Sequence, residues 1–269
     1  MRYEILQNLR IPKIGFGTWS IGGRETGDTT NDAHSLSVLC SALEIGYRHF
    51  DTAEYYAAGH TEELLGQAVR EMRLPREELF ITSKVSPEHL DYQAVLRSCE
   101  NSLRRLGMDY IDLYLIHWPA KDMRLDDAFR ALNTLVNEGK VRHLGVSNFN
   151  LELLVQSCAL AETPILTNQV PYSYVEREYV ENGVLNYCQT KDILLTAYSP
   201  VKRRNIKINK KLQKVAERLE VKVEQIALAW LVQQSRVITI PKSANPLHQA
   251  ENFNAGEMFL GPQELEMLS

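Results

Sequence analysis

Four residues in the first half of the chain have side chains that together can move a proton: Asp51, Tyr56, Lys84 and His117. A tyrosine phenol has a pKa of about 10 in water, about three units too high for easy acid–base catalysis at neutral pH. A neighbouring lysine cation stabilises the phenolate and lowers that pKa, and an aspartate keeps the lysine charged and oriented. A histidine can then position or polarise a carbonyl oxygen. If these four side chains meet, they form a proton-transfer site.

Each of these residues also has a purely structural interpretation when it is taken alone. Asp51 follows an apolar segment and precedes an expected helix, a place where N-caps are common. His117 lies in the segment LIHWP and fits a core histidine. Tyr55 lies beside Tyr56, so one of the two is expected to pack. Lys84 is the hardest to explain in this way, because a lysine that closes the segment FITSK loses its hydration unless it is paired.

The segments that position these residues are short, apolar and rich in β-branched side chains, which is typical of buried parallel strands. Eight segments are expected to be strands: 11–19, 47–53, 79–85, 111–118, 141–149, 164–172, 192–200 and 237–243. Segments with helical spacing of apolar residues lie between them. One is expected to start at Asp91 as N-cap and to stop at Gly107, and another covers 31–44 and ends at Gly46.

Strict alternation of strands and helices calls for a parallel sheet with crossover helices. Eight such units in about 250 residues favour a closed (β/α)8 barrel, an α/β fold, over an open doubly wound sheet or two small domains. Two extra helices are expected near 207–219 and 223–234, and a short β-hairpin is expected over residues 2–14. The sequence contains no linker or low-complexity tract, so we expect a single domain over residues 1–269.

The composition argues against several kinds of partner. A net charge of −4 and a pI near 6.0 provide no broad attraction for nucleic acid or anionic lipid. The four cysteines lie far apart, so buried thiols are expected, and no histidine or cysteine cluster indicates a metal site. The first residues lack the apolar run of a signal peptide, and no segment reaches the length of a membrane span. A cytoplasmic monomer or weak homo-oligomer is expected.

Polar residues follow almost every expected strand. In a barrel of parallel strands, the carboxyl ends of the strands converge on one mouth, so these residues are expected to build a single site. The strand-end residues are Thr18, Trp19, Asp51, Lys84, His117, Ser147, Asn148, Gln169, Tyr198, Ser199, Lys242 and Ser243.

These residues lie in segments that resemble the aldo-keto reductase family. The similar segments occur in the family's order and span nearly the whole chain: GFGTW (15–19), GYRHFDTAEYY (46–56), LFITSKV (79–85), RLGMDYIDLYLIHWP (105–119), GVSNF (145–149), NQVPY (168–172), AYSP (197–200) and IPKS (240–243). The resemblance implies a (β/α)8 barrel that reduces carbonyl compounds with NADP(H). It also implies that Tyr56 is the general acid, Lys84 tunes it, Asp51 pairs with Lys84, and His117 orients the substrate carbonyl.

The resemblance further implies where the cofactor and the substrate lie. Ser147, Asn148 and Gln169 would hold the nicotinamide carboxamide, and Tyr198 would stack on the nicotinamide ring. The implied cofactor contacts are Gly17, Thr18, Trp19, Asp51, Ser147, Asn148, Gln169, Tyr198, Ser199, Pro200, Val201, Lys202, Ile240, Pro241, Lys242, Ser243, His248, Glu251 and Asn252. Among these, Lys242 and Ser243 would meet the 2′-phosphate, and Glu251 and Asn252 the adenine end. The implied substrate contacts are Trp19, Tyr55, Tyr56, His117 and Trp118.

Two departures from the family pattern affect specificity. Members often have an arginine six positions after the lysine that matches Lys242, whereas this chain has His248, which leaves use of NAD(H) open. Loops 119–124 and 201–206 are short, which leaves little chain to cover the mouth and indicates broad specificity for small carbonyl compounds. Two other classes remain open: a regulatory NADP-binding barrel similar to potassium-channel β-subunits, and an unrelated barrel lyase or isomerase.

Overall fold

Parallel strands form a closed ring in this computed structural model, which describes residues 1–6, 9–201 and 203–269. Their order in the sheet follows the sequence, from β3 to β10, and every neighbouring pair is parallel. A parallel bridge between Ile14 and Thr239 closes the ring. The eight strands are β3 (Phe16–Gly17), β4 (His49–Asp51), β5 (Phe80–Val85), β6 (Ile111–Ile116), β7 (Val141–Ser147), β8 (Ile165–Pro171), β9 (Leu194–Tyr198) and β10 (Val237–Thr239). The expected (β/α)8 barrel is confirmed.

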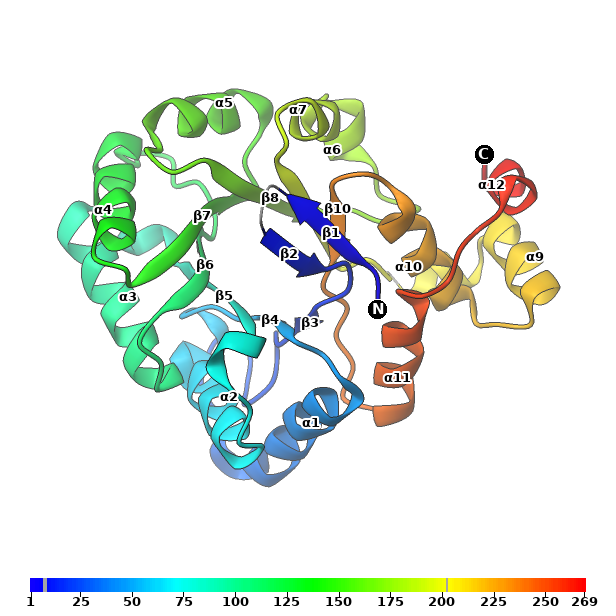
Figure 1. The fold of residues 1–269 in the computed structure, drawn as a ribbon, viewed down its shortest axis with the longest axis horizontal. Coiled ribbons are helices and arrows are strands. Elements are labelled where there is room, and N and C mark those ends of the chain that lie inside the picture. Colours follow the sequence, from blue (N-terminus) through cyan, green and yellow to red (C-terminus); the bar gives the residue numbers. More distant parts are fainter. Residues whose placement is uncertain (7–8, 202) are drawn as a thin grey trace.

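Helices surround this ring on the outside, as Figure 1 shows. They are α1 (Asp32–Ile45), α2 (His60–Glu71), α3 (Tyr92–Leu106), α4 (Leu125–Asn137), α5 (Leu151–Leu160), α6 (Glu178–Glu181), α7 (Val184–Thr190), α8 (Arg203–Lys207), α9 (Lys210–Leu219), α10 (Val223–Gln233), α11 (Pro246–Ala255) and α12 (Pro262–Leu268). The carboxylate of Asp91 accepts a hydrogen bond from the backbone N–H of Ala94 at 2.9 Å, and Gly107 follows the last residue of α3. Both expected ends of this helix are confirmed.

Several expected boundaries differ from the observed ones, and two of these differences have an identifiable cause. The helix expected near 207–219 begins three residues later, as α9, because the side chain of Asn209 accepts hydrogen bonds from the N–H groups of Lys211 and Leu212 and caps the helix there. A separate short helix, α8, precedes it. The first barrel strand, expected over 11–19, is reduced to β3. The chain before it belongs to the hairpin instead, where β2 (Leu9–Pro12) pairs antiparallel with β1 (Tyr3–Leu6).

The hairpin closes one end of the barrel. Figure 1 shows β1 and β2 lying across the ring, and Leu6 and Ile11 pack in a buried cluster with Phe80 and Leu113 from the barrel strands. Alternate residues of a strand share one face, so in β5 Phe80 lies nearest this plug and Lys84 nearest the opposite end. The carboxyl ends of the strands therefore form the open mouth.

The four cysteines all lie in helices and form no disulfide. Cys99 and Cys188 are buried, while Cys40 and Cys158 are half-buried, so the expectation of buried thiols holds fully for two of them. Among the helices that the structure describes, none combines the length and apolar character needed to span a bilayer.

Candidate active site

Three side chains meet at the floor of the barrel mouth. Asp51 is the last residue of β4, and the register of the sheet places it beside β5, which contributes Lys84. The ammonium of Lys84 donates hydrogen bonds to Oδ1 of Asp51 at 2.6 Å, to the carbonyl oxygen of Thr52 at 2.8 Å and to the phenol oxygen of Tyr56 at 3.2 Å. The side chain of Lys84 is fully buried. The lysine therefore has the partners that a buried charge needs.

Asp51 does not fit the N-cap interpretation. Both of its carboxylate oxygens accept hydrogen bonds from side chains of barrel strands, Oδ1 from Lys84 and Oδ2 from the amide of Gln169 at 2.7 Å. The contact with Gln169 has no counterpart in the expectations from the sequence, because β8 lies far along the chain from β4. Asp51 thus links the proton-transfer group to the opposite wall of the cavity.

Burial and charge act in opposite directions on this group. Burial lowers the pKa of Lys84, but the carboxylate of Asp51 and the phenol of Tyr56 outweigh that effect and raise the pKa above its ordinary value. Burial also raises the pKa of Tyr56, and the opposing attraction of Lys84 is smaller. Lys84 thus lowers the pKa of Tyr56, as expected, but burial has the larger effect and keeps that pKa above its ordinary value. Both groups keep their protons at neutral pH, so Tyr56 has a proton that it can donate.

His117 faces the same cavity as a neutral imidazole. Burial, together with the cation of Lys84, lowers the pKa of His117 to about 2. The ring stacks on Trp118 with centroids 3.5 Å apart and meets the edge of Tyr56 at 5.5 Å. Its Nδ1 atom has no hydrogen-bond partner among the described residues. A neutral imidazole has one N–H donor, which suits it to polarise a carbonyl oxygen without giving up a proton.

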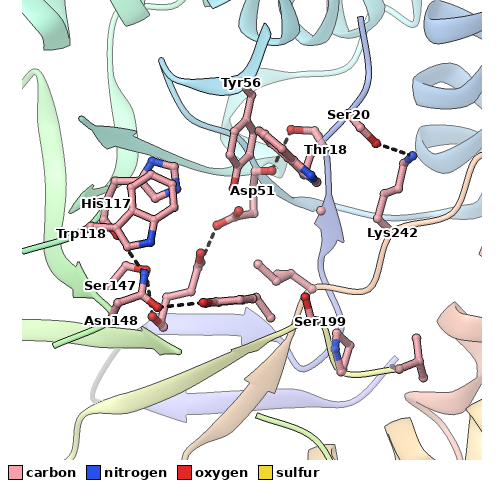
Figure 2. Close-up of a pocket in the computed structure, with 17 residues that line it drawn as sticks. Thr18, Ser20, Asp51, Tyr56, His117, Trp118, Ser147, Asn148, Ser199 and Lys242 are labelled. Atoms are coloured by element: carbon pink, nitrogen blue, oxygen red, sulfur yellow. Dashed lines mark hydrogen bonds between the residues drawn. The ribbon is translucent and has the colours of Figure 1, made fainter. Parts of the chain in front are cut away.

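A cavity of about 500 Å³ opens above these side chains, at the carboxyl ends of the strands. Figure 2 shows His117 and Trp118 on one side of it and Lys242 on the other. The lining residues are Gly17, Thr18, Trp19, Ser20, Asp51, Tyr56, His117, Trp118, Ser147, Asn148, Gln169, Tyr198, Ser199, Pro200, Val201, Ile240 and Lys242. Most of the residues singled out from the sequence are thus brought together.

Tyr55 is placed differently from its expected role at the substrate. It is not among the residues that line the cavity. Its ring stacks parallel on Trp19, with centroids 6.1 Å apart, and meets the edge of Trp118 at 5.6 Å. Tyr55 therefore supports the two tryptophans that form the aromatic walls, and Trp19 remains 40% exposed at the rim.

The residues expected at the carboxamide form a connected cluster. The hydroxyl of Ser147 donates to the carbonyl oxygen of Gln169 at 2.8 Å, and the amide of Asn148 donates to the carbonyl oxygen of His117 at 3.1 Å. The phenol of Tyr198 donates to Oδ1 of Asn148 at 2.8 Å. These bonds join the ends of β7, β8 and β9 into one polar wall beside the ring of Tyr198.

A second cavity of about 730 Å³ adjoins the first, and both share Val201 and Lys242 as lining residues. His248, Glu251 and Asn252, three of the contacts predicted for a cofactor, line this second cavity. Glu251 also forms an ion pair with Lys222.

Two of the expected cofactor contacts, Pro241 and Ser243, are absent from the linings of both cavities. The hydroxyl of Ser243 instead accepts a hydrogen bond from the N–H of Asn245 at 3.1 Å, just before α11. Lys202 lies outside the described residues.

Ser20 is the site residue that the sequence expectations missed. Its hydroxyl accepts a hydrogen bond from the ammonium of Lys242 at 3.1 Å, and Figure 2 shows this bond at the side of the cavity opposite Trp118. The sequence does contain one indication that Ser20 belongs to the site: it directly follows Trp19, the last residue of the first expected strand. Glycine at position 17 lets the chain beside Ser20 approach the chain before Lys242, since a Cβ on Gly17 would lie 2.7 Å from the carbonyl oxygen of Ile240.

Comparison with known proteins gives a consistent result. The sequence model of the Aldo/keto reductase family matches residues 13–269. The glyoxal reductase of Bacillus subtilis is 35% identical over 98% of this chain and 90% of its own length. The methylglyoxal reductase of Escherichia coli is 33% identical over 100% of this chain and 94% of its own length.

Solved structures agree with the sequence matches. A thermostable aldo-keto reductase crystallised with the inhibitor epalrestat superposes with a TM-score of 0.95 at 41% identity, over 100% of this chain and 98% of its own. An aldo/keto reductase from Klebsiella pneumoniae, crystallised with NADP and acetate, superposes with a TM-score of 0.87 at 33% identity. The match covers 99% of this chain and 94% of the other. With the fold, the strand-end site and these matches in agreement, the chain belongs to the aldo/keto reductase family and is an oxidoreductase that acts on carbonyl groups.

Proposed function

We propose that this enzyme reduces aldehydes and reactive ketones to alcohols with NADPH, and that Tyr56 is its proton donor. One observation carries the proposal: the phenol of Tyr56, bonded to the buried pair of Lys84 and Asp51, lines the floor of a cavity at the barrel mouth. A phenol that keeps its proton at neutral pH suits reduction, because the alkoxide formed from a carbonyl must be protonated.

The lining of the two adjoining cavities supports NADP(H) as the cofactor. The polar wall of Ser147, Asn148 and Gln169 offers donors and acceptors for a carboxamide, and the ring of Tyr198 lies next to it. Lys242 lies where the cavities adjoin and can meet a phosphate with charge-assisted hydrogen bonds. When bound, NADPH supplies the hydride. We propose a modest preference over NAD(H), because His248 stands where members of the family often have an arginine.

Each residue of the proton-transfer group has a separate proposed task. Tyr56 gives its proton to the oxygen of the former carbonyl. Lys84 stabilises the phenolate that remains, and Asp51 keeps Lys84 charged and in place. His117 donates an N–H to the carbonyl oxygen and holds it near the phenol. All four are held by neighbouring side chains or strand ends before a substrate arrives, which removes the cost of arranging them during the reaction.

Small activated carbonyl compounds are the proposed substrates. The relatives include a glyoxal reductase and a methylglyoxal reductase. The walls formed by Trp19 and Trp118 are flat and aromatic, and such surfaces discriminate poorly between small planar compounds. We expect several aldehydes to be reduced with Michaelis constants near the usual upper range of about 1 mM. A preference of about 10⁴-fold for one substrate over close analogues would contradict this expectation.

The test is replacement of Tyr56 by phenylalanine. Tyr56→Phe removes only the proton donor, so we expect turnover of methylglyoxal to fall by about 10²-fold or more while NADPH binding stays nearly intact. Tyr55→Phe is the matched control, because it lies next in the chain, packs on Trp19 and is expected to keep its activity. The proposal fails if Tyr55→Phe is the inactive variant, or if the unaltered protein binds NADPH and reduces no aldehyde in a broad screen.

A further inference from the structure

The turn that follows Tyr56 has an unfavourable backbone. Ala57 and Ala58 have φ values of 52° and 53°, and Gly59 has a φ of 93°. The left-handed region is unfavourable for alanine because of its Cβ, so such residues persist only where their surroundings hold them. Whatever holds this turn also sets the direction in which the preceding residue, Tyr56, enters the cavity.

Arg105 packs against the last residue of this turn, Gly59, from the outside of the barrel. It lies in the last turn of α3, and its side chain packs so closely on Gly59 that a Cβ there would lie 2.6 Å from the guanidinium Nε. The same Nε donates a hydrogen bond at 2.6 Å to Oε2 of Glu62, a fully buried residue of α2. The guanidinium is thus fixed between the turn and the helix that the turn begins.

Glu62 connects this arrangement to the strand that contributes Lys84. Its other carboxylate oxygen, Oε1, accepts a hydrogen bond from the hydroxyl of Ser83 at 2.5 Å. Ser83 and Lys84 are neighbours in β5, and successive side chains of a strand point to opposite faces. Ser83 therefore bonds to the helix layer while Lys84 points into the barrel. A single buried carboxylate relates the position of β5 to that of the turn after Tyr56.

We propose that Glu62 and Arg105 are positioning residues for the reaction: they hold residues 57–59 in the left-handed conformation and so keep the phenol of Tyr56 within reach of Lys84. The inference rests on the proposed role of Tyr56. A buried ion pair is weak evidence for stability by itself, whereas a pair that fixes one geometry has a reason to be retained. Neither residue lines the cavity, so both act through Tyr56.

Arg105→Lys is the first test. Lysine keeps a positive charge for Glu62 but lacks the planar group that packs on Gly59. Because small misplacements of a reacting group are costly, we expect kcat to fall by about 10-fold or more, with KM and the dissociation constant of NADPH changed by less than about 2-fold.

A matched control separates positioning from stability. Arg236→Lys alters another arginine–glutamate pair, with Glu4 beside the hairpin, and the two arginine side chains are 22% and 21% exposed. We expect this control to lower the melting temperature without changing kcat. If Arg105→Lys fails to fold, Glu62→Gln tests the same ion pair from the other side. It keeps the size of the side chain, and we expect the same fall in kcat.

Rescue is the decisive measurement. Glycine adopts the left-handed conformation without a Cβ penalty, and Ala58 is exposed, so Ala58→Gly changes little besides that penalty. In the Arg105→Lys background we expect Ala58→Gly to restore most of the lost kcat. The inference is overturned if Arg105→Lys keeps normal kcat, or if Ala58→Gly restores none of the loss. If Tyr56→Phe stays active, it is the proposed function that fails; if Tyr56→Phe is inactive and Arg105→Lys is normal, only the positioning role fails.

Discussion

Lys242 is the residue through which we expect the enzyme to distinguish its two candidate cofactors. Its ammonium lies where the two cavities adjoin and donates to Ser20. A phosphate that replaces this hydroxyl would pair two opposite charges, and such a bond is stronger than one from the ammonium to a neutral hydroxyl. Lys242→Met should therefore weaken NADPH binding by about 10-fold to 100-fold and NADH binding by much less. Fluorescence titration at fixed salt measures both constants.

The control for this prediction is Lys214→Met, which removes an exposed charge that lines neither cavity. Equal losses for the two cofactors in Lys242→Met would contradict a specific phosphate contact. A similar loss in Lys214→Met would assign the effect to overall charge instead.

Single residues of the candidate site were predictable to the extent that their position depends on strand ends. Asp51, Lys84 and His117 end strands, so the barrel rule alone brings them to one mouth. The sign of the pKa shift of Tyr56 was not predictable, because it depends on depth of burial, which a sequence does not contain. Ser20 was missed because its hydroxyl meets a partner from the far end of the chain.

At the level of helices and strands, boundaries with a local chemical signal are the ones that the sequence predicts. Asp91 caps α3, and its carboxylate accepts from the N–H of Ala94. We expect Asp91→Ala to lower the free energy of unfolding by about 1 kcal/mol and to leave kcat unchanged, because the cap lies outside the cavity. Urea unfolding of the variant beside Asp109→Ala, an aspartate outside the cap, measures the difference. Equal stability of the two variants would show that this cap contributes little.

Elements without such a signal escape sequence reasoning. The turn over residues 57–59 is left-handed, yet two of its three residues are alanines, which give no sign of that conformation. The residue that packs on its last position, Arg105, belongs to another helix and lies far along the chain. The shortness of β3 has a similar origin, since the preceding chain is taken up by the antiparallel hairpin. Long-range packing decided both features.

For the molecule as a whole, the interior of the barrel predicts sensitivity to acid. Burial, with a smaller effect of the Lys84 cation, lowers the pKa of His49 to about 3 and that of His117 to about 2. The unfolded chain binds these protons below about pH 6.5 and the folded chain does not. The free energy of unfolding should therefore fall as the pH decreases from about 6.5 toward 3, by at most about 1.4 kcal/mol per pH unit for each histidine. Above that window both states are neutral and this contribution to the pH dependence disappears.

Urea unfolding between about pH 7 and pH 5 tests this acid sensitivity. His49→Gln can still reach Thr82, the partner of the histidine Nε2, and should show a smaller loss of stability over that range than the unaltered protein. His34→Gln, at an exposed position, should follow the unaltered protein. Identical slopes for His49→Gln and the unaltered protein would mean that His49 takes up its proton without unfolding.

The hairpin that closes one end of the barrel affects the route by which substrate enters and product leaves. With one end plugged by Leu6 and Ile11, both adjoining cavities face the carboxyl ends of the strands. The carbonyl compound that enters and the alcohol that leaves then pass through the same open mouth, beside the exposed part of Trp19. A second carbonyl molecule can enter the mouth after the alcohol has left and before the oxidised cofactor has been exchanged. We therefore expect high aldehyde concentrations to slow the enzyme instead of saturating it, and initial rates measured over a wide range of aldehyde concentration would test this.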